Sequence, residues 1–171
     1  CILTAFFTIR YVYLGLSLFY MAHRYLLFTI FFFISLLNSF SQVEKHSSWT
    51  YSFSKKDPKI GEEIDLIFNV QIDPDWYVYS NDFDPKLGPL VAQFNLQSHS
   101  SYQLIGKTVS IKSKKKFDEI WGGDIRYFTH QGEFRQKIKI LEKNVVVKGS
   151  VEYQECSDLN GKCIQHEEDF S

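Results

Sequence analysis

Cys156 and Cys163 are the two side chains in this 171-residue sequence whose types and spacing best suit a reactive site. Six residues separate them, among them Asp158, Asn160 and Gly161, which are strong turn formers. A reversal of the chain there brings the cysteines together across the end of a hairpin. Their Cα atoms need to approach only to about 4.4–6.8 Å for a disulfide to form. The spacing therefore permits a disulfide that opens and closes by thiol–disulfide exchange.

The same two cysteines allow two other interpretations. A structural disulfide would staple the hairpin of a secreted domain, and in a loop this short it would contribute about 2–3 kcal/mol at most. A metal site would add His130 and His166 to the cysteines, but the short Cys-x-x-Cys spacing of zinc sites is absent. A chain of this length has core enough to fold without a staple, which favours the redox interpretation. We predict no metal and no other cofactor.

Acidic residues surround the cysteines in the sequence. Glu155, Asp158, Glu167 and Glu168 all disfavour a thiolate, and Lys162 is the nearby positive charge. A thiol that stays protonated reacts slowly until a specific partner activates it. This suits an electron carrier and argues against a strong oxidant, whose reduced form needs a stabilised thiolate.

The charged residues divide the chain into two parts. Residues 1–42 contain two arginines and no acidic residue, whereas residues 43–171 carry all 20 Asp and Glu with the other 17 of the 19 Lys and Arg. A net charge of about −3 in a segment of this length fits one domain and excludes a two-domain enzyme. Without a basic excess, general nucleic-acid binding has no electrostatic driving force. With 44% hydrophobic and 17% aromatic residues, the chain is too apolar for disorder.

The N-terminal part is typical of an export signal. Residues 21–41 begin at Met21 with a basic start, continue through an apolar stretch and end with small residues at Ser39 and Ser41, as secretory signal peptides do. We expect residues 1–20 to be translated sequence upstream of the true start. The alternative is a pair of membrane helices over 1–20 and 25–41, which would leave the protein tethered.

Both interpretations of the N-terminal part place the domain of residues 42–171 outside the cytoplasm. We expect this compartment to be the periplasm, where disulfides form and persist.

Alternation of apolar and polar residues predicts the elements that must position the cysteines. Apolar side chains take every even position from Ile64 to Ile72, and three charges share one face between Phe134 and Ile140. Further strands are predicted at Trp49–Phe53, Trp76–Tyr79, Val91–Leu96, Tyr102–Ile105, Thr108–Ile111, Ile125–Phe128 and Val145–Tyr153. Seven to nine short strands predict an all-β, immunoglobulin-like antiparallel β-sandwich with little helix.

Four stretches of the sequence, in order, resemble one known family over about residues 47–170. The family is the N-terminal periplasmic domain of the bacterial disulfide reductase DsbD, also described as a disulfide-bond corrector domain. The four stretches are Asp75–Ser80, Gly88–Pro89, Phe117–Gly122, and Val147–Cys163 with its Val-Glu-Tyr-Gln-Glu-Cys run. The chain departs from the family at Ile164–His166, where prolines are common, and in a longer loop between the cysteines.

The resemblance implies an immunoglobulin-like sandwich that passes electrons between two kinds of partner. These are thioredoxin-fold periplasmic proteins and a membrane-embedded reductase domain, in cis or in trans, with cytochrome c biogenesis among the processes served. By the same resemblance, Cys163 forms the mixed disulfide with the partner and Cys156 resolves it. Tyr77 and Tyr79 are expected close beneath the pair.

A cap loop over the disulfide is also implied by the resemblance. Its residues would be Asp118, Glu119, Ile120, Trp121 and Gly122. Either the isoleucine or the tryptophan would shield the sulfurs, and the glycines that follow would let the loop lift.

A protein of a different class remains as the alternative function. The chain would then be a secreted β-sandwich binding or adhesion module whose disulfide is inert. The two hypotheses differ in reduction potential, since structural disulfides lie below about −300 mV.

Overall fold

The computed structural model describes residues 24–26, which are helical, and residues 44–171. The expected upstream segment 1–20 and nearly all of the expected signal peptide 21–41 lie outside the described residues. Within the described ranges, no helix has the length and apolar character needed to cross a bilayer. Residues Lys45–Ser171 form one compact unit, and all that follows concerns this unit.

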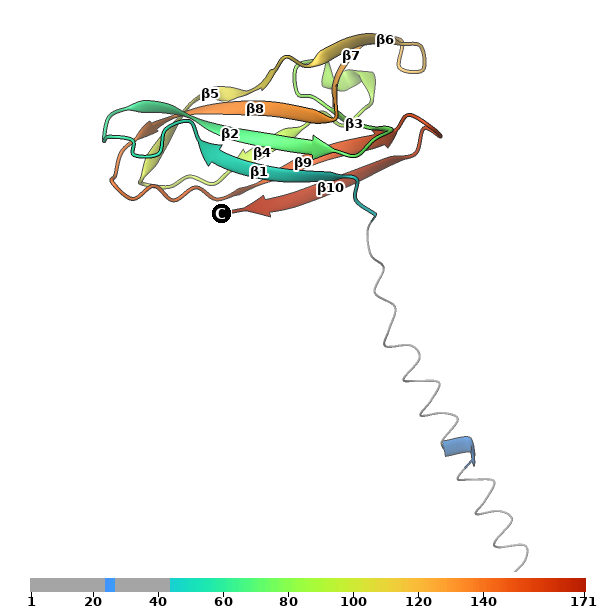
Figure 1. The fold of residues 1–171 in the computed structure, drawn as a ribbon, viewed down its shortest axis with the longest axis horizontal. Helices are drawn as coiled ribbons and strands as arrows, with labels where there is room; N and C mark the ends of the chain where they lie inside the picture. The colour runs from blue at the N-terminus through green and yellow to red at the C-terminus, as the bar shows by residue number, and fades with distance from the viewer. Residues whose placement is uncertain (1–23, 27–43) are drawn as a thin grey trace, which may run out of the picture. The chain divides into compact units, whose positions relative to one another are not determined.

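Ten strands and one short 3₁₀ helix make up the described part of this unit, and every strand pair is antiparallel (Figure 1). They are β1 (Ser47–Phe53), β2 (Glu63–Ile72), β3 (Trp76–Tyr79), η1 (Pro85–Leu87), β4 (Gln93–Leu96), β5 (Tyr102–Ile111), β6 (Lys114–Asp118), β7 (Gly123–Thr129), β8 (Gln131–Ile140), β9 (Gly149–Ser157) and β10 (Cys163–Phe170). One sheet has the order β1-β2-β8-β5 and the other β10-β9-β3-β7-β6, with β4 also paired to β9.

The two sheets pack face to face around an aromatic core. The even-numbered residues from Ile64 to Ile72 of β2 are buried, as the alternation predicts. The ring of Trp49 lies 5.6 Å from that of Phe134 in its own sheet and, across the sandwich, 5.0 Å from that of Tyr153, between centroids. The prediction of an all-β, immunoglobulin-like antiparallel β-sandwich is confirmed.

Some strand boundaries differ from the predicted ones. The segments predicted at Tyr102–Ile105 and Thr108–Ile111 form one strand, β5, whose register shifts between Ile105 and Val109 around Gly106, which has a φ of 67°. The lysine-rich segment Lys114–Asp118 forms edge strand β6, although its charges hide the period-two pattern. Asp118, expected in the cap loop, is therefore the last residue of a strand.

Both cysteines belong to the same sheet. Cys156 lies near the end of β9 and Cys163 begins β10, so the disulfide joins neighbouring strands and leaves the two sheets unlinked. Strand β10 is an edge strand whose partner in the sheet is β9. This arrangement puts the disulfide at one end of the sandwich, beside the β9–β10 turn.

Candidate functional site

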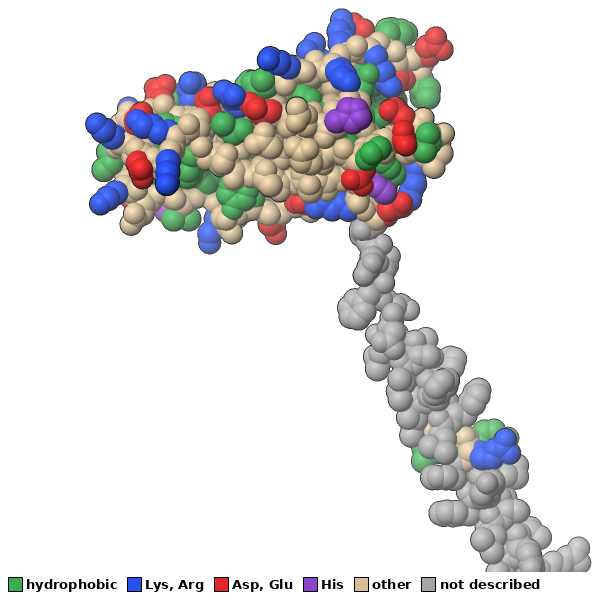
Figure 2. Space-filling view, in the orientation of Figure 1, with side chains coloured by type: hydrophobic (Ala, Val, Ile, Leu, Met, Phe, Trp, Pro, Cys, Tyr) green, Lys and Arg blue, Asp and Glu red, His purple; other side chains and the backbone are tan. Residues whose placement is uncertain are grey.

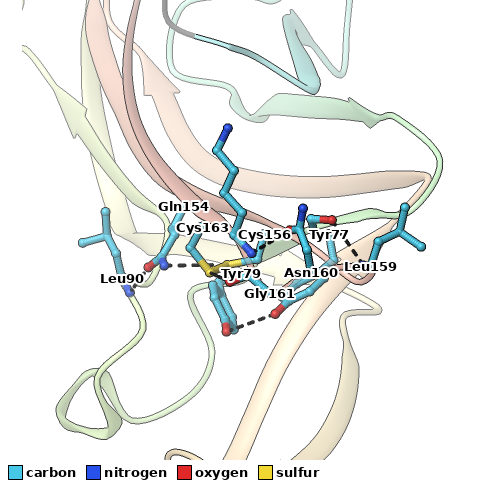
Figure 3. Close-up of a disulfide and its surroundings, with 11 residues drawn as sticks. Tyr77, Tyr79, Leu90, Gln154, Cys156, Leu159, Asn160, Gly161 and Cys163 are labelled. Carbon is cyan, nitrogen blue, oxygen red and sulfur yellow. Dashed lines mark hydrogen bonds between the residues drawn. A yellow bond between two sulfur atoms is a disulfide. The ribbon is translucent and has the colours of Figure 1, made fainter.

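The β9–β10 hairpin brings the two sulfurs together. Cys156 and Cys163 face each other across the strands, with a Cα–Cα distance of 4.1 Å, and form a disulfide (Figure 3). The Ser157 N–H donates to the Lys162 carbonyl at 2.9 Å and closes the hairpin. Gly161 adopts a φ of 70° in the turn, a conformation that glycine accepts without strain. The turn predicted from the sequence is therefore the feature that pairs the cysteines.

The two cysteines differ in exposure. Cys156 is 0% exposed, whereas Cys163 is exposed at the start of the edge strand. Cys163 is therefore the cysteine that faces solvent, whereas Cys156 is enclosed by the protein. The difference in access supports the predicted roles, in which Cys163 reacts with a partner and Cys156 resolves the product.

Aromatic side chains form the floor of the site. Tyr77 pairs with Cys156 across β3 and β9, and it joins Tyr79, Ile125 and Cys156 in a small buried cluster separate from the main core. The two tyrosine rings meet edge to face with centroids 5.4 Å apart, and their hydroxyl oxygens are 3.5 Å apart. The structure thus brings both predicted tyrosines to the disulfide (Figure 3).

Burial keeps these two phenols neutral. Burial is the main cause that raises the pKa of Tyr77 far above its ordinary value, and the Tyr79 hydroxyl, Asp158 and Asp118 raise it further. Burial also raises the pKa of Tyr79, although its contacts with Tyr77 and Trp121 oppose the rise. Both phenols therefore stay neutral even above the ordinary tyrosine pKa of about 10.

Gln154 is a site residue that the sequence reasoning missed. Its Oε1 accepts a hydrogen bond from the Leu90 N–H at 2.8 Å, and its Nε2 lies 3.7 Å from the sulfur of Cys156 (Figure 3). The amide therefore links the loop after β3 to the buried sulfur. A spacing of two residues on one strand, which puts Gln154 and Cys156 on the same face, is the sequence signal that could have identified it.

The predicted cap loop forms the β6–β7 turn. The Asp118 carboxylate accepts hydrogen bonds from the backbone N–H groups of Ile120 at 3.0 Å and Trp121 at 3.2 Å. The Gly122 N–H donates to the Asp118 carbonyl, and Gly122 has a φ of 67°. Glu119 and Ile120 are exposed, the latter at 88%. Asp118 therefore shapes a tight turn that presents an apolar tip to solvent.

Trp121 packs against a second loop. A Cβ atom built on Gly88 would fall 2.3 Å from the indole ring, and one built on Gly123 would fall 2.5 Å from the side chain of Leu87. Trp121 of the β6–β7 turn therefore packs over Gly88, and Leu87 of the other loop packs over Gly123. The indole also interacts with the side chain of Tyr79 on the floor of the site. The shielding of the sulfurs by Ile120 or Trp121 stays a prediction.

The two histidines considered as metal ligands lie apart. His130 occupies the turn between β7 and β8, and His166 contacts Glu155 on the face of β9 opposite Cys156. Within residues 24–26 and 44–171, no group of three or more His, Cys, Asp or Glu is placed to hold a metal ion.

Fold and site together define an immunoglobulin-like sandwich that carries a disulfide at one end, with one of its two cysteines exposed. The chain belongs to the family described as thiol:disulfide interchange protein DsbD, N-terminal, whose model matches residues 46–171. A search of curated proteins found no match.

Two solved structures from Neisseria meningitidis resemble the chain. One is the DsbD N-terminal domain in the reduced form, with 16% identity and a TM-score of 0.40 over 65% of this chain and 78% of the other. The second is the complex between the DsbD N-terminal and the PilB N-terminal domains, with 14% identity and a TM-score of 0.43 over 77% of this chain and 88% of the other.

Proposed function

We propose that this protein is a periplasmic thiol–disulfide exchange domain that passes reducing equivalents to partner proteins through Cys156 and Cys163. The observation that carries the proposal is the asymmetric disulfide, in which Cys163 is exposed and Cys156 is buried against Tyr77. Membership of the DsbD N-terminal family supports the same chemistry. Gln154 holds the buried sulfur beside the loop after β3.

The reaction begins with the domain in its dithiol form. The thiolate of Cys163 attacks one sulfur of a partner disulfide, which forms a mixed disulfide and releases the second partner sulfur as a thiolate. The thiolate of Cys156 then attacks the sulfur of Cys163. The internal disulfide closes and the partner leaves with both its sulfurs reduced, so two electrons have moved to the partner and the two protons of the thiols are released.

The partners follow from the geometry and the family. A narrow reactive point at the end of a sandwich suits partners that present one cysteine on a projecting surface, and we propose thioredoxin-fold proteins of the periplasm. A membrane-embedded reductase domain, in cis or in trans, would restore the dithiol. Acidic and apolar side chains lie side by side at the end of the domain that carries the β9–β10 hairpin (Figure 2), where such partners would dock.

A trapping experiment tests the proposal. A Cys156→Ser variant retains the exposed thiol and lacks the resolving one, so it should accumulate a covalent complex with an oxidised thioredoxin-fold protein. The complex should migrate as one band without reductant and as two bands with it. Recovery of the complex from Cys163→Ser instead would reverse the two roles.

The reduction potential of the pair separates exchange from an inert staple. We expect a value above about −300 mV, in the range of disulfides that exchange with other proteins. A lower value, together with no trapped complex from either serine variant, would mark a structural bridge and overturn the proposal.

A further inference from the structure

A buried carboxyl group lies directly behind the disulfide. Glu155 is 0% exposed and precedes Cys156 in β9, so its side chain points to the opposite face of the sheet. It accepts hydrogen bonds from the His46 backbone N–H at 2.9 Å and from the Ser47 hydroxyl at 2.6 Å. The third partner is His166, whose Nε2 lies 2.9 Å from Glu155 Oε1. A buried polar group with three partners is held in one position.

Glu155 and His166 connect the same two strands as the disulfide does. In the β9–β10 register, Cys156 faces Cys163 and Tyr153 faces His166, so the two links lie within three residues of each other along β10. The disulfide lies on one face of the hairpin and the Glu155–His166 hydrogen bond on the other. The imidazole also stacks on the ring of Tyr153, with centroids 5.2 Å apart.

The glutamate is itself anchored outside the hairpin. Through His46 and Ser47 it is bound to the start of β1, which belongs to the other sheet. Through Glu155, His166 is therefore connected to the start of β1 in the other sheet, as well as to the neighbouring strand β9. Strand β10, by contrast, is an edge strand that pairs with β9 alone within its sheet (Figure 1).

Opening the disulfide removes the covalent link between the strand ends. What remains are the backbone hydrogen bonds of an edge strand, which fray easily, the Tyr153–Glu168 hydrogen bond farther along β10 and, nearer the cysteines, the bond between Glu155 and His166. We infer that this bond is a non-covalent staple that keeps Cys163 opposite Cys156 in the dithiol form. The inference rests on the proposed function, because it concerns the state that exchange creates. Glu155 and His166 are positioning residues, which set the effective concentration of one thiol at the other.

The test is the equilibrium of the purified domain with dithiothreitol. Oxidised dithiothreitol takes two electrons and two protons from the protein dithiol, which closes the protein disulfide and leaves reduced dithiothreitol. The equilibrium constant measures how readily the two protein thiols meet. A His166→Ala variant frees the end of β10 in the dithiol form, so we expect this constant to fall about tenfold, the effect of one buried hydrogen bond.

Two further variants show whether the effect belongs to the hydrogen bond. His166→Gln keeps an N–H donor at a similar reach and should restore the constant to within about twofold of the original protein. Gln165→Ala changes an exposed neutral neighbour on the other face of β10 and should leave it unchanged. Hydrogen exchange should also quicken at residues 163–166 of His166→Ala, in the reduced protein and not in the oxidised one.

A purely structural role gives a different result. The His166→Ala variant would then lose the same stability in its oxidised and reduced forms, and its equilibrium with dithiothreitol would match that of the original protein. That result would overturn the inference. It would leave the proposed function untouched, because the equilibrium with dithiothreitol involves no partner protein. Failure of the trapping experiment, in turn, would overturn the proposed function without changing this equilibrium.

Discussion

At the scale of single residues, strand position explains why two chemically identical cysteines differ. Cys156 lies on β9, where β3 on one side and β10 on the other enclose it above Tyr77. Cys163 opens an edge strand directly after a turn and is exposed. The sequence predicted the pair and its hairpin, because turn formers between two cysteines are a local signal. The contact of Gln154 with Leu90 and those of Glu155 with His46 and Ser47 come from segments distant in the sequence, so no local pattern predicts them.

Removal of the Trp121 side chain tests whether the β6–β7 turn restricts access to the sulfurs. The indole packs on Gly88 and interacts with Tyr79, so its loss should loosen the turn against the second loop. We expect reduced Trp121→Ala to react several-fold faster with a small disulfide reagent, measured by stopped-flow release of the reagent's thiol. Phe117→Ala, which removes an aromatic ring that is 64% exposed on the neighbouring strand, is the control. Equal rates in all three proteins would remove the cap from the mechanism.

Acid should weaken the fold through Asp82, which precedes the loop that holds Gly88. Burial raises the pKa of Asp82, but hydrogen bonds from Ser80 and Ser113 and the charge of Arg126 outweigh it, so the pKa is lowered overall. A carboxyl group with a lowered pKa in the folded state contributes stability above its unfolded pKa and loses it as the pH falls through the folded value.

An Asp82→Asn variant isolates that contribution. Its deficit in free energy of unfolding should be largest near pH 6 and should shrink as the pH falls from about 4 toward 2, below the ordinary aspartate pKa of about 3.9. Urea unfolding at a series of pH values measures it. Ser113→Ala, which removes one of the donors, should give a smaller deficit with the same trend. A deficit that does not change with pH would contradict the assignment.

At the scale of elements, the alternation of side chains predicted the strands that are buried on one face. Strand β3 has the predicted first and last residues. Strands β2 and β8 end where predicted but start earlier in the sequence. The edge strand β6 is not among the strands predicted from alternation, because three consecutive lysines carry no period-two pattern. Strand β9 starts later than predicted, at Gly149, where it begins to pair with β4 and β10. Pairing partners distant in the sequence decide such boundaries.

At Gly149, β4 and β9 pair so closely that a side chain has no room. A Cβ atom there would fall 2.4 Å from the backbone oxygen of Asn95 and 2.8 Å from the ring of Phe170. Because a backbone atom cannot turn aside as a side chain can, Gly149→Ala should force the strands apart and cost about 1–3 kcal/mol of unfolding free energy. Chemical denaturation measures the loss, with the exposed Gln93→Ala of β4 as control. A variant as stable as the original protein would show that the strands can shift freely.

At the scale of the whole molecule, the site and the main core are separate. The main hydrophobic cluster joins β2 and β8 of one sheet to β9 and β7 of the other, around Phe68 and Phe134. The second cluster, which holds Cys156 and the two tyrosines, lies apart from it. The sandwich is therefore held together by contacts that do not involve the sulfurs. A domain that exchanges its disulfide needs this separation, since it must stay folded in both redox states.

The separation predicts a small and specific effect of reduction on stability. Cys156 and Cys163 are seven positions apart, and closing so short a loop restricts the unfolded chain by about 2.5 kcal/mol. We expect the reduced protein to unfold in one cooperative transition with that much less free energy and with nearly the same dependence on urea concentration, because almost the same surface is exposed. Tryptophan fluorescence and circular dichroism should report coincident transitions in both redox states. If reduction instead abolished the cooperative transition, the disulfide would be part of the fold itself, and a domain that unfolds whenever it is reduced could not carry electrons to a partner.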